Sequence, residues 1–153
     1  MGADRSGGFV VVVLLVLAAG LGGITPQVHA AAMMTVNVQN ATVMGQPQPI
    51  LVDATGMTLY YLTSDTMMAS ACTGQCATVW PPLLSSGTPM APSSATGKLG
   101  VVKTANGSQV SYNGHLLYRY APDKKPGDVG GDGRHGPQNG MWHVATPTMK
   151  MAM

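Results

Sequence analysis

The chain has 153 residues and a formal net charge of +2, and charged residues make up only 9% of it, against roughly 25% in average soluble proteins. This length allows one ordinary domain. So little charge excludes a coiled coil or a long solvated helix. The chain also lacks the clustered Lys/Arg face that nucleic-acid binding needs, so we expect no nucleic-acid partner. Gly 20 and Pro 11 predict many turns.

Residues 1–30 resemble an export signal. Arg5 gives a short charged start, and residues 9–21 form an uncharged apolar run. That run has the length of a signal-peptide core and is too short to span a bilayer unaided. Small residues at Val28 and Ala30 predict cleavage after Ala30, and Ala32 is an alternative. We expect a secreted or periplasmic protein with no stable membrane span after cleavage. A retained N-terminal anchor is the other reading.

Both cysteines, Cys72 and Cys76, follow the predicted signal. Exported chains meet an oxidising compartment, so one disulfide is the simplest expectation. It would pin the short turn between the two cysteines. A metal-binding thiolate pair is the alternative, which a single C-x-x-x-C spacing supports weakly.

The body of the chain has the pattern of β-structure. After Ala32 no stretch shows sustained 3.6-residue periodicity, and short β-rich runs alternate with Gly, Pro and Asn. Asn106-Gly107 and Asn113-Gly114 each separate two such runs, which is a strong hairpin signal and predicts a three-stranded meander over 99–120. The expected strands are 35–38, 41–44, 49–52, 57–62, 99–103, 108–112 and 115–120.

An internal duplication is the most informative feature. Residues 56–65 align without gaps on residues 114–123, at an offset of 58. Each copy has Gly, Leu, Tyr and Asp at fixed positions, and each is followed by a tryptophan after a variable loop. We therefore expect two related strands that each end at an aspartate. The repeated positions are Tyr60, Leu62 and Asp65 with Trp80, and Tyr118, Tyr120 and Asp123 with Trp142.

These residues resemble a bacterial family, the secreted repeat of unknown function, also described as a predicted lipoprotein with a Y-x-[FWY]-x-x-D motif. Tyr118-Arg-Tyr120-Ala-Pro-Asp123 carries the full motif, whereas the first copy has Leu62 at the aromatic position. The cysteine pair followed by Trp80-Pro-Pro-Leu83 matches the middle of the family pattern. The lipid-accepting cysteine of many relatives is missing. The resemblance covers about residues 49–146 and implies no established activity.

The expected domain organisation follows. Residues 1–30 are the signal, 31–48 an N-terminal segment, 49–146 the secreted-repeat domain and 147–153 a Met-rich tail. The repeat domain holds two units, at about 49–84 and 99–146. The fold class is all-β: a small secreted domain of two related β-hairpin or meander units with long Gly/Pro-rich loops.

The repeated Tyr and Asp have two interpretations. Alternation places Tyr60 with Leu62, and Tyr118 with Tyr120, on one strand face. In the structural interpretation these side chains pack the sheet and each Asp ties the following loop. In the functional one, Asp65 and Asp123 form a paired metal or ligand site. The loop 123–133 carries three aspartates, and is either a plain surface loop or a Ca²⁺ or anion site without EF-hand spacing.

Catalytic patterns lack support. Ser108 and Ser111 lie in no nucleophile elbow, and the histidines after the signal, His115, His135 and His143, have no metal-motif spacing. We expect no enzyme activity and no cofactor. The expected function is a non-catalytic binding or structural module of the bacterial cell envelope, with an unidentified envelope component as partner.

Methionine is the compositional outlier, because eleven of the twelve follow residue 30. Thioethers suit Cu(I), so a periplasmic Cu(I)-binding protein is the alternative function. Packing and tail composition explain the same residues without a metal. A redox accessory is a third possibility, for which no cofactor site is evident. The candidate copper ligands are Met149, Met151 and Met153 with His115, His135 or His143, and Met33 with Met34 as a second cluster.

Overall fold

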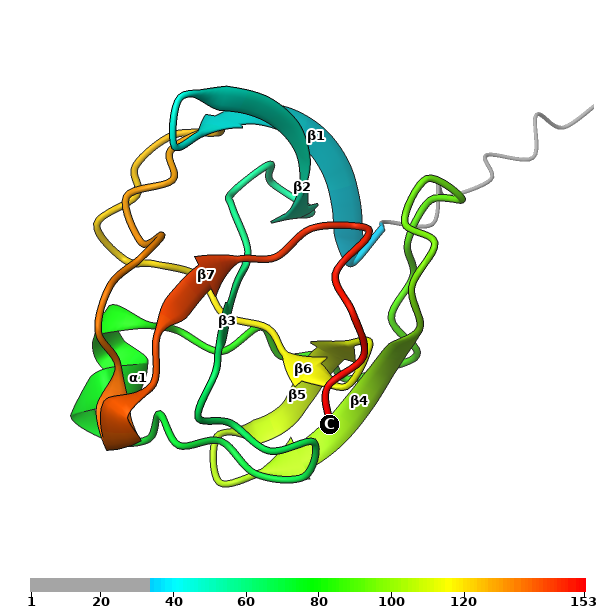
Figure 1. Cartoon of the computed structure of the whole chain (residues 1–153). Coiled ribbons are helices and arrows are strands. Elements are labelled where there is room, and N and C mark those ends of the chain that lie inside the picture. The colour runs from blue at the N-terminus through cyan, green and yellow to red at the C-terminus, as the bar shows by residue number, and fades with distance from the viewer. Residues whose placement is uncertain (1–33) are drawn as a thin grey trace, which may run out of the picture. The chain divides into compact units, whose positions relative to one another are not determined.

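The computed structural model describes residues 34–153, and its first element is a long β-hairpin (Figure 1). Strand β1 (Val36–Val43) pairs antiparallel with β2 (Gln46–Asp53) along its whole length. Met44 and Gly45 turn the chain at φ of 50° and 79°. Two successive positive φ angles match the right-handed twist of paired strands, which makes this turn tight.

The second repeat forms the expected meander. Strands β4 (Leu99–Thr104), β5 (Gly107–Tyr112) and β6 (His115–Leu116) build a three-stranded antiparallel sheet in the order β4-β5-β6. Asn113 and Gly114 form the second turn at φ of 50° and 82°. The Asn113-Gly114 turn is confirmed, whereas the first turn is formed by Ala105 and Asn106, with Gly107 as the first residue of β5. Strand β6 is shorter than the predicted run.

Each repeat gives its tryptophan strand to the other repeat. Strand β3 (Tyr60–Leu62) of the first copy pairs antiparallel with β7 (Trp142–Val144) of the second. The segment after Trp80 makes the reverse exchange, because the Leu83 amide donates to the Leu117 carbonyl at 2.9 Å. The equivalent bond in the other half joins the Ala145 amide to the Leu59 carbonyl at 2.8 Å. The two repeats are therefore interlocked.

The core lies on both faces of the two tyrosine strands. Leu59 and Leu117 are buried in one apolar cluster, and the tyrosines that follow them, Tyr60 and Tyr118, are buried in the other. This division is the alternation that strand geometry requires. The cluster of the two tyrosines contains Tyr60, Leu62, Cys72, Trp80, Leu116, Tyr118, Tyr120 and Trp142.

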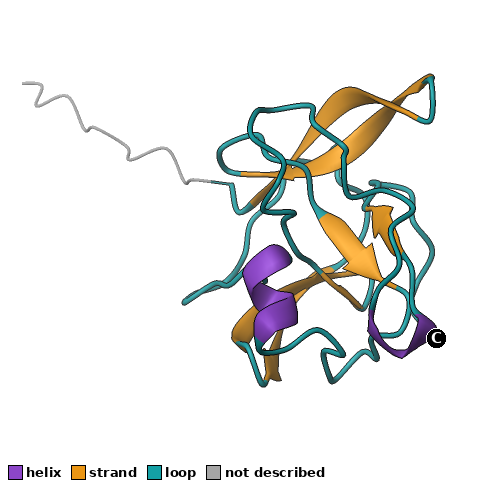
Figure 2. Ribbon diagram, turned by 90° about the vertical axis from the view of Figure 1, so that its left-hand side faces the viewer, coloured by secondary structure: helices purple, strands orange, loops and turns teal. Residues whose placement is uncertain are grey.

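A short helix interrupts the β-structure, and the sequence did not predict it. Helix α1 (Gln75–Val79) lies between β3 and the Trp80 segment, and a 3₁₀ turn (Pro137–Asn139) precedes β7 (Figure 2). Five residues are too few to show helical periodicity. Pro81 and Pro82 prevent its continuation. The predicted Cys72–Cys76 disulfide is confirmed and joins the helix to the loop before it.

Two predicted boundaries do not separate structural units. The boundary at 48/49 falls within β2, whose residues pair with β1. The tail 147–153 is also held by the fold: the Asn113 side-chain amide donates to the Met149 carbonyl, and the Ala152 amide donates to the Asn113 carbonyl, both at 2.8 Å.

Residues 34–153 belong to one compact unit. The predicted export signal and Met33 lie outside the described residues. Within the described part of the chain, no helix has the length and apolar character needed to cross a membrane.

Candidate functional site

The two copies of the duplicated motif meet through equivalent residues. The Tyr60 amide donates to the Tyr118 carbonyl at 2.8 Å, and the Tyr118 amide donates to the Tyr60 carbonyl at 2.9 Å. These reciprocal bonds relate the copies by a local two-fold arrangement. The sequence duplication is thus present as a structural duplication.

The tyrosine and aspartate side chains are also exchanged between copies. The Tyr60 hydroxyl donates to Asp123 Oδ2 at 2.5 Å, and the Tyr118 hydroxyl donates to Asp65 Oδ2 at 2.6 Å. The second oxygen of each carboxylate accepts an amide of its own loop, from Ala71 for Asp65 and from Gly130 for Asp123. We call Tyr60, Asp65, Tyr118 and Asp123 the Tyr–Asp clasp.

Burial and charge keep the clasp hydroxyls protonated. Burial, together with the hydrogen bond to Asp123, raises the pKa of Tyr60 above its usual range. Burial and the bond to Asp65 do the same to the pKa of Tyr118. Burial also raises the pKa of Asp65 despite its hydrogen bonds. Both tyrosines therefore act as fixed donors, and the geometry matches the interpretation in which each Asp ties a loop. The two carboxylates face different tyrosines.

The tryptophans of the two repeats stack on each other in the apolar cluster that also contains Tyr60 and Tyr118. The Trp80 and Trp142 rings lie 3.8 Å apart at an interplanar angle of 5°. Tyr60 meets Trp80 edge-on at 5.5 Å, and Tyr118 meets Trp142 edge-on at 5.0 Å. The two edge-to-face contacts have a favourable aromatic geometry. Aromatic packing thus crosses the boundary between the two repeats.

The aspartates of loop 123–133 bind separate partners. Asp128 Oδ2 accepts the amides of Lys124 and Lys125, and Asp132 Oδ1 accepts the Val144 amide at 3.0 Å. Among residues 34–153, no group of three or more His, Cys, Asp or Glu side chains is placed to hold a metal ion. The carboxylates of this loop are accordingly spread over different partners.

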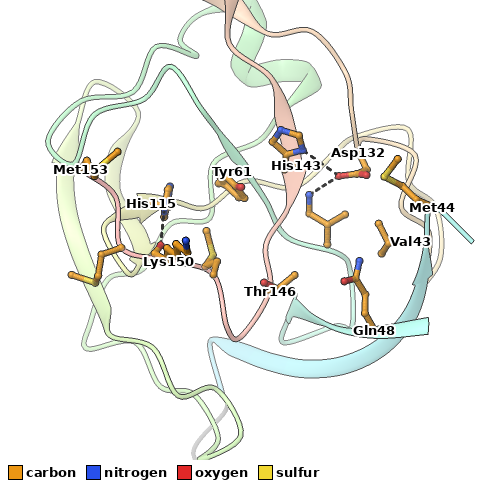
Figure 3. A pocket seen from close by; sticks show the side chains of 13 residues that line it. Val43, Met44, Gln48, Tyr61, His115, Asp132, His143, Thr146, Lys150 and Met153 are labelled. Carbon is orange, nitrogen blue, oxygen red and sulfur yellow. Dashed lines mark hydrogen bonds and ion pairs between the residues drawn. The ribbon is translucent and has the colours of Figure 1, made fainter. Parts of the chain in front are cut away.

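A hollow of about 710 Å³ opens on the face of β3 that carries Tyr61 (Figure 3). Its aromatic side chains come from three strands: His115 from β6, Tyr61 from β3 and His143 from β7. The Tyr61 ring centroid lies 4.6 Å from that of His115 and 5.8 Å from that of His143. The Tyr61–His143 register of β3 and β7 places these rings side by side. We call this the His–Met hollow.

The C-terminal segment forms the second wall of the His–Met hollow. Met149, Met151 and Met153 all line it, and His115 Nε2 lies 3.1 Å from the Lys150 carbonyl oxygen. Met149 also packs against the core cluster that contains Leu59 and Leu117, whereas Met151 is 56% exposed. The segment that looks like a loose tail in the sequence is thus a fixed part of the site.

Electrostatics favour a neutral imidazole at His115. Burial lowers the pKa of His115, and the bond to the Lys150 carbonyl opposes this in part. The His143 Nδ1 atom lies 3.8 Å from Asp132 Oδ1. A neutral imidazole has a free lone pair on one nitrogen, so it can accept a hydrogen bond or ligate a metal.

The structure brings together only part of the predicted copper set. His135 lies elsewhere, in a hollow with Trp80, Tyr120 and Arg134, whose guanidinium lies 5.0 Å from the Tyr120 ring centroid. Sequence reasoning missed Tyr61, Met44 and Asp132 as lining residues of the His–Met hollow. Of these three, only Tyr61 had a signal in the sequence, because strand alternation places it on the face opposite Tyr60 and Leu62.

These features define a class: a two-repeat all-β protein whose halves exchange a tryptophan strand and a tyrosine–aspartate hydrogen bond. The family described as a secreted repeat of unknown function matches residues 42–84 and 100–146. The chain belongs to this family, and the two matched ranges confirm both the predicted resemblance and the duplication. The family description supports a secreted location. No curated protein and no solved structure matches the chain.

Proposed function

We propose that this protein is a non-catalytic binding module of the bacterial cell envelope, in which the Tyr–Asp clasp is the scaffold and the His–Met hollow is the ligand site. The observation that carries the proposal is the division of polar groups between these two places. The ionisable groups of the family motif are used inside the fold. His115, His143 and Asp132, which are not part of the clasp, line the hollow.

The clasp supports a structural role for the motif. Tyr60 is fully buried and Asp123 is only 9% exposed, so neither group meets solvent freely. A general acid or base needs access to substrate and a pKa near the working pH. The raised pKa values of Tyr60 and Tyr118 move these groups away from that range.

The His–Met hollow supports a binding role. It offers two half-buried imidazoles, one carboxylate at Asp132 and several thioethers around one open space. Binding sites commonly combine an apolar lining with a few placed polar groups. Tyr61 supplies an aromatic wall between His115 and His143.

The test uses the full chain expressed with its own N-terminus and recovered from the extracytoplasmic fraction. The protein carries ¹³C-methyl methionine, and its methyl resonances are recorded before and after adding a concentrate of small molecules from the same fraction. We expect shifts at Met149, Met151 and Met153, with Met90 as the internal control because it lies away from the hollow. Shifts at Met90 alone, or recovery of the chain only from the cytoplasm, would overturn the proposal.

A further inference from the structure

We propose that the rim of the His–Met hollow binds one Cu(I) ion through His115 Nδ1 and the thioether sulfurs of Met151 and Met153. This inference rests on the proposed function, because it names the ligand class of the same hollow. It is more specific than the sequence expectation, since it selects three of the candidate side chains and leaves the others out.

The first argument is the orientation of His115. A carbonyl oxygen can only accept, so the contact between His115 Nε2 and the Lys150 carbonyl at 3.1 Å requires the hydrogen on Nε2. The lone pair is then on Nδ1. Metal-binding histidines characteristically donate their other ring N–H to a carbonyl or carboxylate, which fixes the tautomer and the ring direction. His115 is held in this way by the very segment that carries the methionines.

The second argument is the placement of the thioethers. Met151 and Met153 follow Lys150, whose carbonyl is bound to His115, and the Ala152 amide between them donates to the Asn113 carbonyl at 2.8 Å. One side-chain bond from His115 and one backbone bond from Ala152 thus hold this segment beside the turn that leads into His115. Met151 is 56% exposed and Met153 is fully exposed, so neither sulfur is committed to the core. Figure 3 shows Met153 on the same side of the hollow as His115.

The other candidates are excluded by their surroundings. Met149 packs against the core cluster that contains Tyr112 and Leu117, so its side chain anchors the segment. His143 is separated from His115 by the Tyr61 ring, which stacks at an angle against both. The set that remains is one nitrogen and two sulfurs.

The donor set selects the metal. Soft thioethers favour Cu(I), whereas Ca²⁺ and Mg²⁺ require oxygen ligands and structural Zn²⁺ sites use thiolates, imidazoles or carboxylates. The only two cysteines of the chain are joined in a disulfide, so thiolate competition within the protein is removed. Thioethers bind without losing a proton, so two of the three ligands are insensitive to pH.

The test is a competition titration of the full chain with the Cu(I) chelator bicinchoninate under anaerobic conditions. The variant Met151→Leu/Met153→Leu should lose at least tenfold in Cu(I) affinity, and His115→Gln should do the same. The matched control Met57→Leu/Met90→Leu removes two methionines that do not line the hollow and should retain wild-type affinity within threefold. Equal losses in the control, or a loss below threefold in the first variant, would overturn the proposal.

Two further measurements separate the possible failures. Urea unfolding should be unchanged in Met151→Leu/Met153→Leu, because both side chains are exposed, so a lost affinity is not a lost fold. Thiol titration after the copper experiment should detect no free thiol; copper that binds only once thiols appear would overturn the proposal. If wild-type protein binds no Cu(I) yet the methionine shifts with envelope small molecules remain, the metal is wrong and the binding function stands. If both are absent, the proposed function fails as well.

Discussion

The Tyr–Asp clasp makes a quantitative prediction for the substitution Tyr60→Phe. The change removes one oxygen and keeps the ring that packs against Trp80. Asp123 Oδ2 then loses its donor at a position where the residue is only 9% exposed. The Gly131 amide, which donates to the Tyr60 hydroxyl at 3.3 Å, loses its acceptor as well.

The magnitude follows from these two bonds. A hydrogen bond to a charged group contributes about 1.5–3 kcal/mol, and a buried group left without its partner costs about 1–3 kcal/mol. The Gly131 contact is long, so we assign most of the loss to Asp123. Tyr60→Phe should therefore lower the free energy of unfolding by about 2–3 kcal/mol. Tyr118→Phe should cost a similar amount, because its hydroxyl binds Asp65 at 2.6 Å and Ser70 at 2.7 Å.

Equilibrium unfolding in urea, followed by tryptophan fluorescence, measures these changes, since Trp80 and Trp142 are both in the affected cluster. The matched control is Tyr61→Phe in the same strand, whose hydroxyl has no hydrogen-bond partner among the described residues. It should stay within about 0.5 kcal/mol of wild type, as surface changes do. If Tyr60→Phe were equally neutral, or if Tyr61→Phe cost as much, the clasp would not hold the repeats together.

Three further predictions concern other parts of the fold. Gly131→Ala should destabilise by about 1–3 kcal/mol, because an added Cβ would lie 2.7 Å from the Trp80 ring, whereas Gly87→Ala meets no atom within 4 Å and should be neutral in the same urea assay. Replacing both Cys72 and Cys76 by Ala should cost about 2 kcal/mol from loop entropy, given a sequence separation of 4; calorimetry showing no change in the melting temperature would contradict this. Burial acts to raise the pKa of Asp53, but hydrogen bonds from Thr55, Met57 and Arg119 outweigh it and hold the pKa below its ordinary value. The ionised Asp53 carboxylate therefore stabilises the fold above the unfolded pKa of about 3.9, and this stabilisation is lost as pH falls through the lower folded value. Asp53→Asn should flatten the acid limb of a curve of unfolding free energy against pH. An unchanged acid limb would refute the assignment.

Local chemistry in the sequence determined several elements of this protein. The Asn113-Gly114 turn needs positive φ, which these residues tolerate, so the meander was readable from the chain. The cysteine spacing and the predicted export together determined the disulfide. The gapless duplication gave the repeat, and alternation gave the two faces of the tyrosine strands. Met44-Gly45 turns by the same geometry, but a methionine at that position carries no turn signal.

Only the tertiary structure decided how the repeats are joined. The spacing of Tyr60 and Asp65 is the same whether the tyrosine binds its own aspartate or Asp123, because sequence periodicity fixes which face a side chain occupies and not which chain segment lies opposite. The His–Met hollow has the same origin. Its histidines come from strands of different sheets and its methionines from the C-terminal segment, and the bonds that gather them, such as the one between Asn113 and Met149, join residues 36 positions apart. Such contacts depend on packing and backbone satisfaction across the whole domain, which a linear pattern does not encode.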